Sequence, residues 1–382
     1  MKPIAITLGD PCGIGPEVVL KAFAQGLPAP ALVVGDPGLL AREAARLKLP
    51  LSVRTIASPA AADRAQSGFG AGVPGAGLPG AGVPGVGLPG VGVPGVGLPG
   101  TGTGSGAGPG TPVAGIDVPV IAVSSLPADL APGRVDARAG EVAYRAILRA
   151  SELALRGEVR AVVTAPISKE ALNLAGHDYP GHTELLAEIA GGTPVRMMLA
   201  NRELRTVLVT IHVALREAIA GLTRESIVET IEIADAALRR AGIAAPRVAV
   251  AGVNPHAGEA GMFGREEIDV VAPAIAQARE RGIDASGPYP PDTIFMRARG
   301  FAHFDVVIAM YHDQGLIPVK YLGLDDGVNI TIGLPFVRTS PDHGTAFDIA
   351  GQPGPHGLGL ADARSLRAAF EQAHAMAGGG AR

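Results

Sequence analysis

The amino-acid sequence predicts an α/β protein with two lobes, in which parallel or mixed sheets are covered by helices. Short β-branched runs alternate with longer amphipathic stretches along the chain, which is typical of repeated strand and helix units. The expected strands read as nearly continuous apolar runs, as strands buried on both faces do. The length of 382 residues exceeds what one hydrophobic core usually supports. We therefore expect two lobes that share one cleft.

Seven strands and five helices account for most of this pattern. The strands are expected at Ile4 to Leu8, Ala31 to Val34, Val118 to Val123, Ala161 to Thr164, Thr206 to Val213, Arg247 to Val253 and Asp305 to Met310. The helices are expected at Pro16 to Gln25, Arg138 to Arg156, Arg224 to Ala241, Arg265 to Arg281 and Ala361 to Ala377. In the second of these helices, Val142, Ile147 and Leu153 recur at helical spacing between charged positions.

A low-complexity insert interrupts the first lobe. From Gly72 to Gly100 the chain repeats a five-residue unit of the type V/L-P-G-V/A-G, and Thr101 to Gly110 stays rich in glycine. Regular proline prevents helix and ladder formation, and abundant glycine makes ordering entropically costly. We expect residues 70–110 to form a disordered surface loop that resembles elastin-type sequence, rather than a self-associating tether.

Charge and cysteine content exclude several classes of protein. There are 32 Lys and Arg residues against 36 Asp and Glu residues, a balance that argues against a nucleic-acid or anionic-membrane binder. Cys12 is the only cysteine, so an internal disulfide is impossible and a thiolate metal site is disfavoured. The first residues carry only a five-residue apolar stretch, too short for the core of a signal peptide. A cytoplasmic protein is expected.

The run from Met310 to Gly351 combines residues that bind metals and anions. His312 can ligate a metal, Lys320 and Arg338 can hold an anion, and Asn329 can hydrogen-bond a hydroxyl or phosphate oxygen. Each residue alone would fit a buried β region with solvated charges. Their occurrence in one short run predicts one wall of an active site.

Three histidines follow three different expected strands. His212 ends the strand TVLVTIH, His256 lies three residues after RVAVAGV, and His312 lies two residues after DVVIAM. Open α/β sheets bind ligands just outside the carboxyl ends of their strands. Three imidazoles with one free position form a known arrangement for a catalytic divalent metal. A histidine at a strand end is more often a hydrogen-bonded core residue, but the set of three predicts a metal centre.

Two further segments place polar groups beside expected helix starts. In GHTELLAEIA, Thr183 can cap the next helix, and His182 can present a hydrogen-bonding group beside its positive end. In LGDPCGIGPEVVLKAF the dinucleotide spacing G-x-G-x-x-G is absent, so a tight strand-to-helix turn is the better interpretation. There Asp10 either faces the cleft or caps the turn. Cys12 has no base or cation beside it in sequence and is expected to be structural.

Taken together, these segments resemble a known family over nearly the whole chain except the insert. They are similar to the signature blocks of 4-hydroxythreonine-4-phosphate dehydrogenases, enzymes of pyridoxine biosynthesis. The blocks read GDPCGIGPE, VVTAPISKEALNLAG, GHTELLAE, TIHVALREA, GVNPHAGEAGMFGREE, GPYPPDTIF and YHDQGLIPVKYLGLDDGVNITIGLPFVRTSPDHGTAFDIAG. Departures from the family pattern are the insert and Cys12, where alanine is commoner.

The resemblance implies a fold like that of isocitrate and isopropylmalate dehydrogenases, with the active site in the cleft between lobes. We place the first lobe at residues 1–135 plus about 325–382, and the second, with the metal-binding histidines, at about 136–324. The resemblance also implies a homodimer whose active site is completed at the subunit interface. In the family's blocks the metal ligands fall on His212, His256 and His312, and the substrate contacts fall on His182, Thr183, Lys320, Asn329 and Arg338.

The implied reaction is oxidation of the secondary alcohol of 4-phosphooxy-L-threonine by NAD or NADP, followed by loss of carbon dioxide. One divalent metal, zinc, magnesium or cobalt, would lower the pKa of the alcohol. Lys320 and Arg338 would hold the phosphate. Asp292 in the PPDT segment is either a further polar group near the metal or a helix cap. No segment is assigned to the nicotinamide cofactor.

Three other functions stay open at this point. Relatives in the same family oxidise D-threonate or D-erythronate 4-phosphate, and the segment NLAGHDYPGHTELLAE is compatible with that branch. Other relatives act on unphosphorylated cyclic diols, which the phosphate-binding residues disfavour. In a different class, the same metal and anion groups could serve a metal-dependent phosphoester hydrolase.

Overall fold

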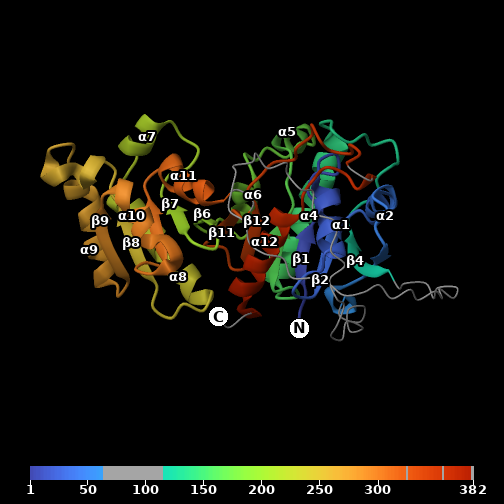
Figure 1. Ribbon diagram of the computed structural model, residues 1–382, viewed down its shortest axis with the longest axis horizontal. Helices are drawn as coiled ribbons and strands as arrows, with labels where there is room; N and C mark the ends of the chain where they lie inside the picture. Colours follow the sequence, from blue (N-terminus) through green and yellow to red (C-terminus); the bar gives the residue numbers. More distant parts are fainter. Residues whose placement is uncertain (63–114, 324–325, 355–356, 380–382) are drawn as a thin grey trace, which may run out of the picture.

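One mixed sheet of twelve strands runs through the part of the chain that the computed structural model describes, residues 1–62, 115–323, 326–354 and 357–379. The strand order is β3-β4-β2-β1-β5-β12-β11-β6-β7-β10-β8-β9. Figure 1 shows that the strands of the two halves lie in separate groups, each surrounded by its own helices. The bounds of the strands are β1 Ile4–Thr7, β2 Ala31–Gly35, β3 Leu51–Thr55, β4 Ile116–Ala122, β5 Ala161–Thr164, β6 Arg196–Ala200, β7 Arg205–Leu208, β8 Arg247–Ala251, β9 Asp284–Tyr289, β10 Val306–Ala309, β11 Val328–Ile332 and β12 Val337–Pro341.

The strands pair in parallel at both ends of the sheet and antiparallel in its middle. β3, β4, β2, β1, β5 and β12 pair in parallel, and so do β7, β10, β8 and β9. The pairs β12 with β11, β11 with β6, and β6 with β7 are antiparallel. The chain therefore joins two parallel α/β halves through a short antiparallel segment, and the two central strands β11 and β12 come from near its end.

Helices cover both groups of strands. Their bounds are α1 Gly15–Ala24, α2 Pro37–Arg46, α4 Ala137–Leu155, α5 Lys169–Leu174, α6 His182–Ile189, α7 Leu215–Ala220, α8 Arg224–Arg240, α9 Ala272–Glu280, α10 Pro291–Ala298, α11 His312–Leu322 and α12 Arg364–His374. α4 packs against β1 and β2, α12 packs against β12, β5 and β11, and α8 packs against β6, β7 and β10. The strand residues beneath them are almost entirely buried, which is why they read as apolar runs.

The α/β fold and all seven expected strands are confirmed, with corrections to their ends. The strand expected over 206–213 stops at Leu208, so His212 lies in the loop that follows it. The helix expected over 265–281 consists of a π-helical turn, η3 (Glu267–Val271), followed by α9. The helix expected from Ala361 begins at Arg364. Strands β3, β6, β9, β11 and β12 were not predicted.

The N-terminal loop has a structural role. Asp10 is fully buried, and its Oδ1 accepts a hydrogen bond from the backbone N–H of Cys12 at 2.8 Å. Gly9 has φ +75°, and a Cβ there would lie 2.5 Å from the carbonyl oxygen of Pro166, so only glycine fits this close approach. Burial raises the pKa of the Cys12 thiol to about 12. The turn-capping interpretation of Asp10 and the structural interpretation of Cys12 agree with these contacts.

Two expectations from the sequence are not decided by the fold. The repeat insert, residues 70–110, lies outside the described residues. The lobe boundaries near 135 and 325 stay a prediction, although α4, just beyond the first boundary, packs against β1 and β2. Within the described ranges, no helix has both the length and the apolar character needed to cross a membrane.

Candidate active site

A cavity of about 400 Å³ lies where residues of both halves of the sheet meet. Thr164 at the end of β5, and Ser340 to Gly344 at and after the end of β12, line it from one half. His212, in the loop after β7, lines it from the other half. Met197 and Asn329 also line the cavity, from β6 and β11, the two strands that lie between β12 and β7. Four of the expected substrate-binding residues line this cavity, namely His182, Thr183, Asn329 and Arg338.

Arg338 is a buried cation with no carboxylate partner among the described residues. It lies on β12 and is 2% exposed. Its Nη1 donates to Thr331 Oγ1 at 2.9 Å, its Nη2 donates to Thr164 Oγ1 at 2.6 Å, and its Nε has no partner. Burial lowers the pKa of the guanidinium to about 9, so it remains charged at neutral pH. An uncompensated buried charge is costly unless an anion joins it.

His182 and Asn329 add unpaired hydrogen-bonding atoms to the same cavity. His182 begins α6 at its positive end, and its Nε2 is buried without a partner. Desolvation, together with the charge of Arg338, holds the pKa of this imidazole well below its usual range. Asn329 Nδ2 approaches the Sδ of Met197 at 3.3 Å, while its Oδ1 has no partner. A neutral imidazole, an amide and a guanidinium can together hold a phosphate and a neighbouring hydroxyl.

Lys320 is near the cavity but does not line it. Its Nζ pairs with Asp342 Oδ2 at 2.8 Å, and its side chain is 39% exposed. Asp342 itself lines the cavity. Because exposed ion pairs contribute little free energy, Lys320 can exchange this partner for a bound anion at small cost. The structure therefore brings four of the five expected substrate-binding residues into the cavity. The fifth, Lys320, contacts Asp342, which lines the cavity.

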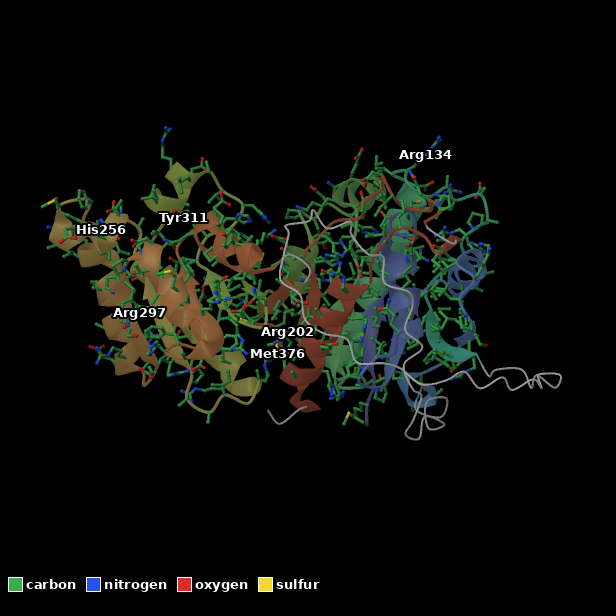
Figure 2. All side chains as sticks on the ribbon, in the orientation of Figure 1. Arg134, Arg202, His256, Arg297, Tyr311 and Met376 are labelled. Atoms are coloured by element: carbon green, nitrogen blue, oxygen red, sulfur yellow. The ribbon has the colours of Figure 1, made fainter. Side chains whose placement is uncertain are left out.

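The three histidines expected to bind metal come together only in part. His212 and His312, the first residue of α11, have ring centroids 5.6 Å apart. Figure 2 shows His256 at the outer end of the molecule, apart from Tyr311, the residue before His312. Across the described ranges, no three His, Cys, Asp or Glu side chains lie close enough to share one ion. Within one subunit, the residues fit a three-histidine metal site only in part.

Asp292 is also separate from the main cavity. It lies in the first turn of α10, whose N-cap residue is Pro290 rather than Asp292. It lines a second cavity of about 460 Å³ together with Tyr311 and Asp313. Asp292 therefore lies near the start of α11, by the two residues that flank His312 in sequence. It does not line the cavity that contains Arg338.

The sequence interpretation missed several cavity residues. Lys169 of α5 and Asp342 line the main cavity, and Thr164 and Thr331 hold Arg338. Lys169 and Asp342 follow the ends of β5 and β12, so the rule that ligand sites lie beyond strand ends could have found them. β12 was not recognised, however, and Thr331 and Thr164 gave no signal because threonine is common in strands.

The fold and the cavity define an α/β protein with a polar cavity, containing a buried arginine, between its two halves. The model of the family described as "Pyridoxal phosphate biosynthetic protein PdxA" matches residues 28–373. The chain therefore belongs to this family. The relatives that it resembles are dehydrogenases, which are oxidoreductases.

Similar proteins carry two different substrate names. A 4-hydroxythreonine-4-phosphate dehydrogenase of Beijerinckia indica is 47% identical over 97% of this chain and 94% of its own length. A D-threonate 4-phosphate dehydrogenase of Salmonella typhimurium is 45% identical over 91% of this chain and 93% of its own. The crystal structure of a 4-hydroxythreonine-4-phosphate dehydrogenase from Klebsiella pneumoniae superimposes with a TM-score of 0.79, at 43% identity and 98% coverage of both chains.

The lowered pKa of His182 gives a testable dependence of stability on pH. Because its pKa is lower in the folded chain than the ordinary 6.5, the unfolded chain binds a proton first, and stability should fall as pH drops below about 6.5. Replacing His182 with Asn should remove this loss, which has a slope of at most about 1.4 kcal/mol per pH unit. Denaturant unfolding of both proteins from pH 7.5 to 5 measures the difference. Parallel curves would contradict the assignment of a neutral, desolvated imidazole.

Proposed function

We propose that this protein oxidises the secondary alcohol of 4-phosphooxy-L-threonine with NAD or NADP in pyridoxal 5'-phosphate biosynthesis. The product, 2-amino-3-oxo-4-phosphooxybutanoate, then loses carbon dioxide to leave 3-amino-2-oxopropyl phosphate. The observation that carries this proposal is the buried Arg338, which has no carboxylate partner among the described residues and lies in a cavity with unpaired polar atoms. The family membership and the relative from Beijerinckia indica support the choice of reaction.

The residues of the chain bind and orient the substrate. Arg338 holds the phosphate, and Lys320 joins it by exchanging Asp342 for the incoming anion. His182, Thr183 and Asn329 hydrogen-bond the remaining polar oxygens. Fixing the phosphate at the base of the cavity places the hydroxyl carbon at one position, which lowers the entropic cost of hydride transfer. The nicotinamide cofactor accepts the hydride when bound.

We also propose that a divalent cation, zinc, magnesium or cobalt, binds at the histidines. The ring centroids of His212 and His312 lie 5.6 Å apart, and both residues are expected ligands. We propose that the third is the partner subunit's His256 in a homodimer, because the chain's own His256 lies at the outer end of the molecule. Met262 and Phe263, which follow it, are 74% and 48% exposed, as residues of a subunit interface would be in an isolated chain. When bound, the cation would lower the pKa of the substrate hydroxyl.

The second candidate function is oxidation of D-threonate or D-erythronate 4-phosphate. It is supported by the relative from Salmonella typhimurium, whose identity to this chain is nearly as high. Both candidates need the same phosphate site, and they differ at the carbon that carries either an amino or a hydroxyl group. The cyclic diols have weaker support, from a structure of lower identity, and the assay below tests the phosphoester hydrolase.

A direct assay distinguishes these functions. Purified protein with NAD or NADP and a divalent metal should raise the absorbance at 340 nm when 4-phosphooxy-L-threonine is added, and should release carbon dioxide in equal amount. D-threonate 4-phosphate and D-erythronate 4-phosphate should react at least about tenfold more slowly in kcat/KM, a difference of about 1.4 kcal/mol. Faster oxidation of either would select the second candidate. Release of phosphate without reduction of the cofactor would reject both dehydrogenase functions.

The metal proposal predicts a loss of bound ion in three separate variants. Replacing His212, His256 or His312 with Ala removes one of three protein ligands, so bound metal and turnover should fall together while the protein stays folded. Elemental analysis and circular dichroism of the purified variants measure both properties. His303→Ala, an exposed histidine outside the cavity, is the matched control. A full complement of metal in all three variants would reject the site.

The shared site can be tested by mixing inactive subunits. A dimer of one His212→Ala subunit and one His256→Ala subunit would contain one intact site. Random pairing of the two co-expressed chains should therefore restore about a quarter of the wild-type activity, because half of the dimers are mixed and each has one good site of two. Absence of any recovery, when each variant alone forms dimers, would show that each site is built from one chain.

A further inference from the structure

The segment that carries His256 has an unusual backbone. After β8, the residues from His256 to Ala260 have φ values of 53°, 53°, 79°, 42° and 54°. This is the left-handed region, and only one of the five, Gly258, is a glycine. Left-handed conformation costs other residues about 1–2 kcal/mol each. Such a turn persists only where surrounding contacts hold it.

Glu267 makes those contacts on the chain that enters the turn. It is the first residue of η3 and is 3% exposed. Its Oε1 accepts hydrogen bonds from the backbone N–H groups of Val253 and Asn254, both at 2.7 Å. Its Oε2 accepts one from Asn254 Nδ2 at 3.0 Å. Asn254 is two residues before His256, so the carboxylate fixes the backbone from which the turn starts.

The carboxylate also fills the inside of the turn. A Cβ added to Gly258 would lie 2.6 Å from Glu267 Oε2, and a Cβ added to Gly252 would lie 3.0 Å from Oε1. In the part of the chain that the structure describes, no Lys, Arg or His forms an ion pair with Glu267. A buried carboxylate that is held only by amide groups is costly to desolvate. The position of this carboxylate inside the turn is sufficient to explain its contacts. They do not require a bound substrate or cation.

We propose that Glu267 is a positioning residue for His256. It holds the left-handed turn so that the imidazole is presented at the outer end of the molecule, where a second subunit can use it. Glu267 lines neither of the two cavities described above, so its proposed effect acts only through His256. This inference rests on the proposed role of His256 as a metal ligand, and it goes further by naming the group that fixes that ligand.

The test measures metal affinity rather than activity. Co²⁺ is titrated into the metal-free dimer in competition with a coloured chelator, for wild type, Glu267→Ala, Glu267→Gln, His256→Ala and the double variant Glu267→Ala with His256→Ala. Glu267→Ala should weaken Co²⁺ binding by about 10- to 100-fold, as loss of a group that orients a ligand does. Glu267→Gln keeps an oxygen for the two backbone N–H groups, so its affinity should stay within about threefold of wild type.

The double variant decides whether Glu267 acts through His256. If it does, adding Glu267→Ala to His256→Ala should change the affinity by no more than about twofold, because the ligand that it positions is already absent. The matched control is Glu266→Ala, since Glu266 Oε2 bonds Asn254 Nδ2 at 2.6 Å but does not bond the backbone that enters the turn. This variant should bind Co²⁺ nearly as wild type does.

A second variant covers the case in which Glu267→Ala fails to fold. Gly258→Ala keeps the carboxylate but forces a Cβ against it at φ +79°, so it should weaken Co²⁺ binding in the same way. The inference is overturned if either variant folds and binds Co²⁺ as wild type does while His256→Ala does not, or if the losses in the double variant add. If His256→Ala itself keeps wild-type affinity, the proposed metal site fails instead.

Discussion

The burial of the Arg338 guanidinium in the middle of the sheet is the constraint on which the account of this protein depends. Arg338 lies on β12, and its hydrogen bonds reach Thr331 on β11 and Thr164 on β5. These strands are where the parallel half of the sheet gives way to the antiparallel segment. The two hydroxyls orient the guanidinium but cannot neutralise it, and its Nε stays unpaired. The fold therefore holds a buried positive charge, which an anion from outside the chain would neutralise.

The same charge explains the neighbouring groups. It helps to keep the imidazole of His182 neutral by lowering its pKa, so this side chain acts through hydrogen bonds rather than as a second cation. Asp342 is held by Lys320 at the edge of the cavity, which keeps its carboxylate paired in the absence of substrate. The cavity thus has a fixed cation at its base and an exchangeable ion pair at its rim. A bound phosphate would be held by Arg338 and, once Lys320 turns from Asp342 to the anion, by a second cation.

Sequence patterns predicted the apolar strands and four residues that line one cavity, but not the position of His256 apart from His212 and His312. β1, β2 and β5 are fully buried, largely apolar runs, and their pattern indicates strands that are covered on both faces. β11 and β12 were missed because Asn329, Arg338 and other polar groups interrupt the apolar run, and these two residues line the cavity. The position of His256 was not predictable from spacing, since the chain after β8 enters a left-handed turn that begins at His256. The spacing of apolar residues indicates which helices and strands are buried, but it gives no information about such turns.

The most direct test of the central role of Arg338 is ligand-dependent stability. Inorganic phosphate, added at constant ionic strength against chloride, should raise the melting temperature of the wild-type protein, with a gain of about 2.7 kcal/mol at a hundred times Kd. Arg338→Met should be at least as stable as wild type without phosphate, because it removes a buried unpaired charge, and should show no gain with phosphate. A variant that folds and keeps the full phosphate-dependent stabilisation would contradict the account.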